Sequence, residues 1–147
     1  MMKNFILFVN LLIVCSVFIP QNSNAQSIPT VTELNNFING NQFLVTYREG
    51  EAVYGTYYFM EIHYCASGGY GLYGKSVKQT VLGNEQQSNW QEFGNWKVME
   101  LNGNVGIYYK TTTFQERFVP IYRLPDGTFF IGEGITIVKQ GKAICNN

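Results

Sequence analysis

Apolar and polar residues alternate in short segments along most of the chain after residue 40, as in strands with one buried and one solvated face. Glycine-containing turns, among them Ser67-Gly68-Gly69, Asn102-Gly103 and Asp126-Gly127, separate these segments. Short strands joined by tight turns indicate an antiparallel meander that closes into a barrel or packs as a sandwich. The pattern predicts strands at 42–48, 55–65, 69–74, 76–82, 90–101, 104–112, 117–125, 128–133 and 135–139.

One segment has helical rather than strand periodicity. Thr30 and Glu33 have the spacing of a capping box, in which each side chain hydrogen-bonds the backbone of the other residue. Asn39-Gly40 ends the segment, because glycine adopts the left-handed conformation of a helix C-terminus. A short helix before the strands is therefore expected, with one apolar face formed by Val31, Leu34, Phe37 and Ile38.

The Asn102-Gly103 pair predicts a two-residue hairpin between the strands at 90–101 and 104–112. This register sets Trp96 opposite Tyr109 and Val98 opposite Ile107. Because side chains alternate between the two faces of a strand, the register also defines an apolar inward face. That face carries Trp96, Val98, Val105, Ile107 and Tyr109.

Asp126-Gly127 is interpreted as a second hairpin turn of the same kind. The register then pairs Tyr122 with Ile131 on an apolar face. The opposite face places Arg123 beside Phe130, where the two side chains would form an exposed cation–π pair.

The strand at 55–65 has two candidate faces. We take Tyr58, Met60, Ile62 and Tyr64 as inward, which leaves Glu61, His63 and Cys65 pointing outward. A C-terminal tail folded over the barrel wall would bring Cys145 to Cys65.

Residues 1–25 have the layout of a secretory signal peptide: a lysine at position 3, an apolar run, and Ala25 at the expected cleavage site. A transmembrane anchor would need about 20 apolar residues, and this run has about 15. We therefore expect one domain at 26–147, secreted or periplasmic and without membrane association after cleavage. In an oxidising compartment the two remaining cysteines, Cys65 and Cys145, are expected to form a disulfide.

Charge excludes one class of partner. The chain has ten basic and ten acidic residues, and removal of residues 1–25 takes away one lysine and leaves a net charge of −1. Since nucleic-acid binding depends on clustered Lys and Arg, and none cluster here, we expect no nucleic-acid partner.

Several motifs resemble small secreted lipocalin-like domains of the calycin type. They are Cys65-x-Ser67-Gly68-x-Tyr70, Gly94-Asn95-Trp96-Lys97-Val98, Gly103, Ile107 and Asp126-Gly127. In lipocalins the Gly-x-Trp motif lies in the first strand, whereas here it lies in the middle of the chain. The resemblance implies an all-β fold, an antiparallel up-and-down barrel of about eight strands with one short N-terminal helix. It also implies a binding protein for hydrophobic ligands or an inhibitor of other proteins.

Candidate catalytic chemistry is sparse. His63 is the only histidine and Asp126 the only aspartate, and the turn at 126–127 uses the aspartate. A Ser-His-Asp triad and a four-ligand zinc site both need more than this. Glu61 beside His63 is interpreted as a solvated pair on the outward face. Two glutamates at strand ends, Glu100 and Glu133, are interpreted as barrel-rim carboxylates. We therefore expect no enzyme activity, metal or cofactor.

Two binding hypotheses remain open. In the first, the barrel interior holds a small apolar ligand on an inward face lined by Tyr58, Met60, Trp96, Ile107, Tyr109 and Tyr122, with Glu133 as a polar contact at the rim. In the second, exposed tyrosines together with Arg123 and Phe130 recognise a carbohydrate or a protein partner. A hollow barrel favours the first hypothesis, and a filled barrel with an exposed aromatic patch favours the second.

Overall fold

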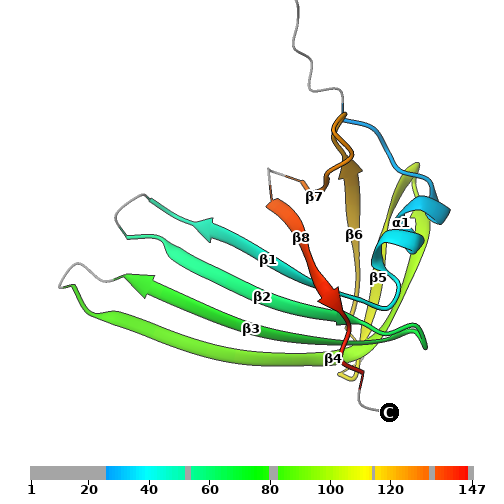
Figure 1. Cartoon of the computed structure of the whole chain (residues 1–147). Coiled ribbons are helices and arrows are strands. Elements are labelled where there is room, and N and C mark those ends of the chain that lie inside the picture. The colour runs from blue at the N-terminus through cyan, green and yellow to red at the C-terminus, as the bar shows by residue number, and fades with distance from the viewer. Residues whose placement is uncertain (1–25, 52–53, 80–82, 114, 133–134, 146–147) are drawn as a thin grey trace, which may run out of the picture.

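Eight strands follow one another around a barrel in chain order, each antiparallel to the next, and the last pairs with the first. This computed structural model describes residues 26–51, 54–79, 83–113, 115–132 and 135–145. The fold class predicted from the sequence is confirmed (Figure 1). The elements are α1 (Val31–Ile38), β1 (Asn41–Glu49), β2 (Thr56–Tyr64), β3 (Gly69–Gln79), β4 (Glu85–Leu101), β5 (Asn104–Thr111), β6 (Glu116–Arg123), β7 (Phe129–Ile131) and β8 (Ile135–Lys142).

Every strand differs from its predicted range by at least one residue at one end or both, and the largest differences are in β3 and β4. The segments 69–74 and 76–82 were predicted as separate strands, but β3 runs without interruption through Lys75 to Gln79, and 80–82 lie outside the described residues. Likewise, β4 begins at Glu85 rather than at residue 90. The two strands pair along eleven residues, and this long ladder continues through Gly74.

Helix α1 closes one end of the barrel (Figure 1). The predicted capping box is present: the Thr30 hydroxyl accepts from the Glu33 N–H at 3.1 Å, and the Glu33 carboxylate accepts from the Thr30 N–H at 2.8 Å. Leu34 and Ile38 are fully buried in the core, whereas Val31 is 39% exposed and lies outside the buried face.

The hairpin between β4 and β5 has the predicted register. Asn102 and Gly103 have φ values of 53° and 77°, as a type I′ turn requires. Trp96 lies opposite Tyr109, and Val98 lies opposite Ile107. Four of the five predicted inward residues are buried, and Val98 is partly buried.

The predicted register between β6 and β7 is wrong by one residue. Leu124 donates its N–H to the Thr128 carbonyl, so the loop has three residues, 125–127, rather than two. Tyr122 consequently lies opposite Phe130, not Ile131. Since a one-residue slip exchanges the two faces of a strand, Ile121 takes the inward place predicted for Tyr122, and Ile121 is 1% exposed.

The barrel is closed along only part of its length. β8 pairs with β1 only as far as Val45, and β5 pairs with β4 only from Gly94 onward. The β1 residues 46–49 and the β4 residues 85–93 therefore lie in a four-stranded extension of the barrel wall, which leads away from α1 (Figure 1). We call this part the open half, and the part beneath α1 the closed half.

Gly94 lies where β4 passes from the open half into the closed half. A β-carbon at this position would approach the Lys110 carbonyl oxygen to 2.1 Å. The strand can therefore turn tightly against β5 only because no side chain is present.

Candidate functional site

The closed half is filled by side chains. Three of the predicted ligand-lining residues, Trp96, Ile107 and Tyr109, are 7%, 1% and 4% exposed and belong to the core. The rings of Trp96 and Tyr64 pack at 5.2 Å, and those of Tyr109 and Tyr70 at 5.1 Å. Leu34 and Ile38 of α1 cover this core from the barrel end. These residues are therefore part of the packed core and do not line a ligand cavity.

The remaining predicted residues are divided among different places. Tyr58 and Met60 lie on the inward face of β2, with Tyr58 in the open half and Met60 opposite Val45, where the pairing of β1 with β8 ends. Tyr122 lies on the outer face, where its ring packs at 5.6 Å against Phe130. Glu133 lies outside the described residues. The structure thus brings Tyr58 and Met60 together and separates both from Tyr122.

Three partly buried aromatic side chains form a row on the inner face of the open half. The rings of Tyr47 and Tyr58 stack at 4.6 Å with an interplanar angle of 9°. The Trp90 ring meets Tyr58 at 6.2 Å and 72°. Tyr47 and Tyr58 therefore form a stacked pair, and the indole of Trp90 lies beside this pair, nearly perpendicular to the Tyr58 ring.

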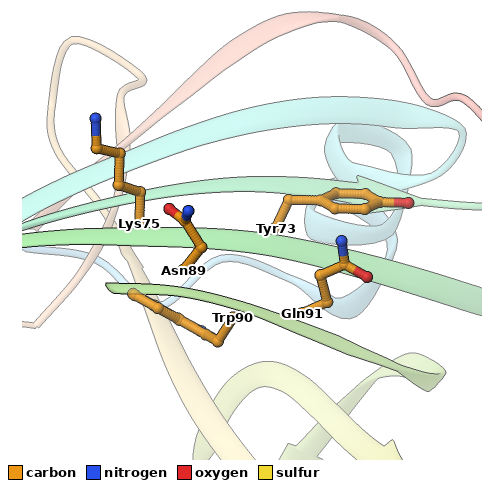
Figure 2. Close-up of a pocket in the computed structure, with 6 residues that line it drawn as sticks. Tyr73, Lys75, Asn89, Trp90 and Gln91 are labelled. Atoms are coloured by element: carbon orange, nitrogen blue, oxygen red, sulfur yellow. The ribbon is translucent and has the colours of Figure 1, made fainter. Parts of the chain in front are cut away.

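Trp90 can take this position because Gly74, its cross-strand partner on β3, has no side chain. The indole occupies the space where a β-carbon on Gly74 would be. Figure 2 shows the Trp90 side chain on the side of β4 opposite to Asn89 and Gln91. One face of the indole thus lies against the sheet, while the other faces the interior of the open half.

A polar hollow of about 470 Å³ adjoins the aromatic row. Alternation places five of its lining residues on the same inner face as Tyr58 and Trp90. Hydroxyl and amide groups predominate there, with a single charge. These five residues, which we call the polar rim, are Thr56, Ser76, Lys78, Gln86 and Ser88.

Two charged side chains on this inner face, Glu49 and Lys78, differ in whether they have a partner. Glu49 accepts a hydrogen bond from the Tyr58 hydroxyl, and burial together with this carboxylate raises the pKa of Tyr58. Lys78 has no ion-pair or hydrogen-bond partner among the described residues. The lysine ammonium is thus available to a ligand, whereas the glutamate is already engaged.

A second polar cluster lies between the open and closed halves. The hydroxyls of Tyr64 and Tyr109 hydrogen-bond each other, and Tyr70 donates to Glu92 at 2.5 Å. Glu92 also pairs with Arg117, whose guanidinium lies 5.1 Å above the Tyr109 ring. Burial raises the pKa of Tyr109 to about 12 and raises that of Tyr64 well above its usual value. Since these groups satisfy one another's hydrogen-bonding capacity, the cluster has a structural role at the boundary between the two halves.

His63 is buried, contrary to the prediction of a solvated pair with Glu61. Its side chain lies under the C-terminal segment, and the residue is 3% exposed. Nε2 lies 2.7 Å from Glu61, and Nδ1 accepts the Ile144 N–H at 3.0 Å. Both ring nitrogens are thus engaged, and neither is free to act as a general base.

The predicted disulfide between Cys65 and Cys145 is present, with a Cα–Cα distance of 5.8 Å. The tail crosses the outer wall as expected. It forms one side of an outer hollow of about 390 Å³, whose aromatic wall consists of Tyr73 and Phe93, each 42% exposed. A further hollow on the outer face adjoins it (Figure 2). It is lined by Tyr73, Lys75, Asn89 and Gln91, and also by Gly74 and Trp90, which lie between them on β3 and β4.

The predicted exposed pair of Arg123 and Phe130 does not form. Phe130 is 5% exposed, and Arg123 forms an ion pair with Glu33 at 3.1 Å. The one-residue register error explains the difference, because it moves Arg123 to the face that meets α1.

The sequence-based prediction missed Trp90 and Lys78 as candidate site residues, and it named Tyr47 only as one of the clustered tyrosines at 47–73 that suit a recognition surface or a ligand cavity. Trp90 lies six positions before Trp96 on the same strand, so extending the alternation from Trp96 would have placed it on the inner face. Lys78 could not be found in this way, because the opening of the barrel depends on long-range strand pairing.

Metal-binding clusters and membrane-spanning helices are both absent from the part of the chain that the structure describes. Within it, no cluster of three or more His, Cys, Asp and Glu side chains is arranged to hold a metal. Within the same ranges, no helix is sufficiently long and apolar to span a bilayer. Comparisons with protein-family models, with curated proteins and with solved structures find no match to the chain.

Proposed function

We propose that the protein is a secreted, non-catalytic, lipocalin-like binding protein that holds a small amphipathic molecule on the inner face of its open half. The observation that carries this proposal is the row of Tyr47, Tyr58 and Trp90 beside the polar rim. Apolar surface with a few convergent polar groups is the usual composition of a small-molecule site. The signal-peptide pattern at 1–25 and the disulfide support secretion.

The geometry favours the open half over the interior of the closed half. Core side chains fill the closed half, and admitting a ligand there would require displacing them at a cost of several kcal/mol. In the open half, by contrast, the three aromatic side chains are only partly buried. A ligand that covers them removes further apolar surface from water, which is favourable by roughly 25 cal/mol per Å².

A titration with 1-anilinonaphthalene-8-sulfonate, an amphipathic aromatic anion, tests the proposal. Probe fluorescence should rise to saturation, and Trp90→Ala should weaken binding, because the probe loses its stacking surface. Phe93→Ala is the matched control, since Phe93 is an aromatic residue of the same strand on the outer face. Unsaturable binding, or equal effects of the two variants, would contradict a site on the open half.

Recognition of a protein partner through the outer wall is the second candidate. Its specific support is the exposure of Tyr73, Phe93 and Ile144 around the outer hollow. Large exposed apolar residues gathered in one place often mark an interaction surface. In the titration above, a loss of probe binding in Phe93→Ala but not in Trp90→Ala favours this candidate.

A further inference from the structure

The open half combines an aromatic floor and wall with a rim of hydroxyl and amide groups, and it is not enclosed. From this combination we infer that the ligand is a saccharide chain, an inference that rests on the proposed function. The sugar would stack its C–H face on Trp90, beside Tyr58, while its hydroxyls hydrogen-bond the polar rim. The inference follows from three features of the site.

The first feature is the orientation of the aromatic rings. Gly74 lets the indole of Trp90 lie against the sheet, so one broad face of the ring is directed toward the interior. Tyr58 meets this ring at 72° and is supported from behind by Tyr47. The rings therefore form a flat floor and a standing wall. A pyranose ring, which is flat and has an apolar C–H face and a polar edge, fits such a corner better than a flexible chain does.

The second feature is the chemistry of the polar rim. Ser76 and Ser88 are cross-strand partners. In the next row along the inner face, further from the closed half, Thr56 and Gln86 lie on either side of Lys78. Hydroxyl groups both donate and accept, and a primary amide does the same with its two ends. Such side chains match the vicinal hydroxyls of a sugar, which also donate and accept. A wholly apolar ligand would leave these groups without partners.

The third feature is the openness of the site. Apolar ligands are normally enclosed, with 70–90% or more of their surface buried. Here β1 along residues 46–49 pairs only with β2, and β4 along residues 85–93 pairs only with β3, so each strand has one open edge and a bound molecule keeps one side in water. A ligand with one side in water must be hydrophilic on that side. The open edges also allow a chain longer than the hollow to extend past the site.

The test uses three defined probes, namely cellohexaose, chitohexaose and hexagalacturonate, in isothermal titration calorimetry with the full mature chain. We expect saturable binding of at least one probe. Trp90→Ala should weaken that binding about tenfold, because a stacking contact of this kind is worth roughly a factor of ten. Ser76→Ala should weaken it about fivefold through the loss of a hydrogen bond.

Two outer-face variants serve as matched controls. Phe93→Ala removes an aromatic ring, and Lys75→Ala changes the neighbour of Ser76 on the opposite face of β3. Both should retain the wild-type affinity. Thermal unfolding of each variant establishes that the fold is intact, and Ser76→Ala remains informative if Trp90→Ala does not fold.

Separate outcomes overturn the two proposals. If 1-anilinonaphthalene-8-sulfonate binds through Trp90 but none of the three oligosaccharides binds, the saccharide inference fails while the proposed site stands. If an oligosaccharide binds and Trp90→Ala and Ser76→Ala leave its affinity unchanged, the inference fails because the sugar lies elsewhere. If neither kind of probe binds, both proposals fail.

Discussion

The indole of Trp90 lies where a side chain on Gly74 would otherwise be. A β-carbon added to Gly74 would approach Cε2 of the indole to 2.0 Å, which is far inside van der Waals contact. The two residues are cross-strand partners on the inner face of β3 and β4. The absence of a side chain at position 74 therefore determines how the largest aromatic surface of the open half is presented.

The first prediction concerns this pair. Gly74→Ala should displace the Trp90 ring from the sheet and weaken binding of 1-anilinonaphthalene-8-sulfonate, because the floor of the proposed site is lost. Fluorine NMR of protein labelled with 5-fluorotryptophan measures the displacement directly. The chain has two tryptophans, and only the Trp90 resonance should move.

Gly71→Ala is the control for that variant. Gly71 lies on the same strand but on the outer face, where an added β-carbon would meet the Phe93 ring at 3.3 Å. This change should leave both tryptophan resonances and probe affinity near their wild-type values. An unmoved Trp90 resonance in Gly74→Ala is the result that contradicts the prediction.

The second prediction compares how much each of the two tryptophans contributes to the free energy of unfolding. Trp96 is 7% exposed, and its indole N–H donates to the Cys65 carbonyl at 3.0 Å. We expect Trp96→Ala to lower the free energy of unfolding by about 3–5 kcal/mol, as for other large buried aromatic residues. Trp90→Ala should lower the free energy of unfolding by much less, because that ring is only partly buried. Denaturant unfolding of both variants decides, and equal costs would refute the division into closed and open halves.

The third prediction concerns the tail. Cys65 and Cys145 are 80 residues apart in sequence, so their bond strongly restricts the unfolded chain. Replacing both with alanine should lower the free energy of unfolding by about 4 kcal/mol in the chain-entropy model. Hydrogen exchange of the Ile144 amide should also accelerate, since its acceptor His63 lies beside the bond. A loss under about 1 kcal/mol in denaturant unfolding would contradict the expectation.

Local turn chemistry explains both the correct and the incorrect strand registers predicted from the sequence. Asn102-Gly103 forms a two-residue loop, and every pair predicted across it is present. Asp126-Gly127 has similar residues but forms part of a three-residue loop that begins with Pro125, a residue favoured at the second position of type I turns. That single extra residue moved Tyr122 to the outer face and separated Arg123 from Phe130.

The candidate site was less predictable than the fold, because it depends on contacts between distant segments. Alternation placed Tyr58 and Met60 on the inner face correctly. It could not indicate that β8 leaves β1 after Val45, which is what opens that part of the barrel. Similarly, the pattern around His63 suggested exposure, since the covering residue Ile144 lies 81 positions away. Local periodicity determines which face a residue occupies, whereas its burial depends on long-range packing.

The last prediction concerns pH and the buried tyrosines of the closed half. The unfolded chain ionises its tyrosines near pH 10, whereas burial raises the pKa of Tyr109 to about 12 in the folded protein and raises that of Tyr64 well above its usual value. Above about pH 10 the folded state therefore holds more protons than the unfolded state. Stability from this source is complete below pH 10 and is lost as the pH rises.

For Tyr109 alone, the free energy of unfolding should fall by about 1.4 kcal/mol per pH unit between about pH 10 and 12. Guanidinium unfolding at pH 9, 10 and 11 measures this slope. The double variant Tyr64→Phe/Tyr109→Phe is the control, because it removes both hydroxyls of the hydrogen-bonded pair and leaves neither unpaired. The slope of this variant should be shallower than that of the wild type, because the two buried hydroxyls are absent. Lys and exposed Tyr ionise alike in both proteins and do not change the comparison. Equal slopes would show that these two hydroxyls do not carry the alkaline sensitivity of the fold.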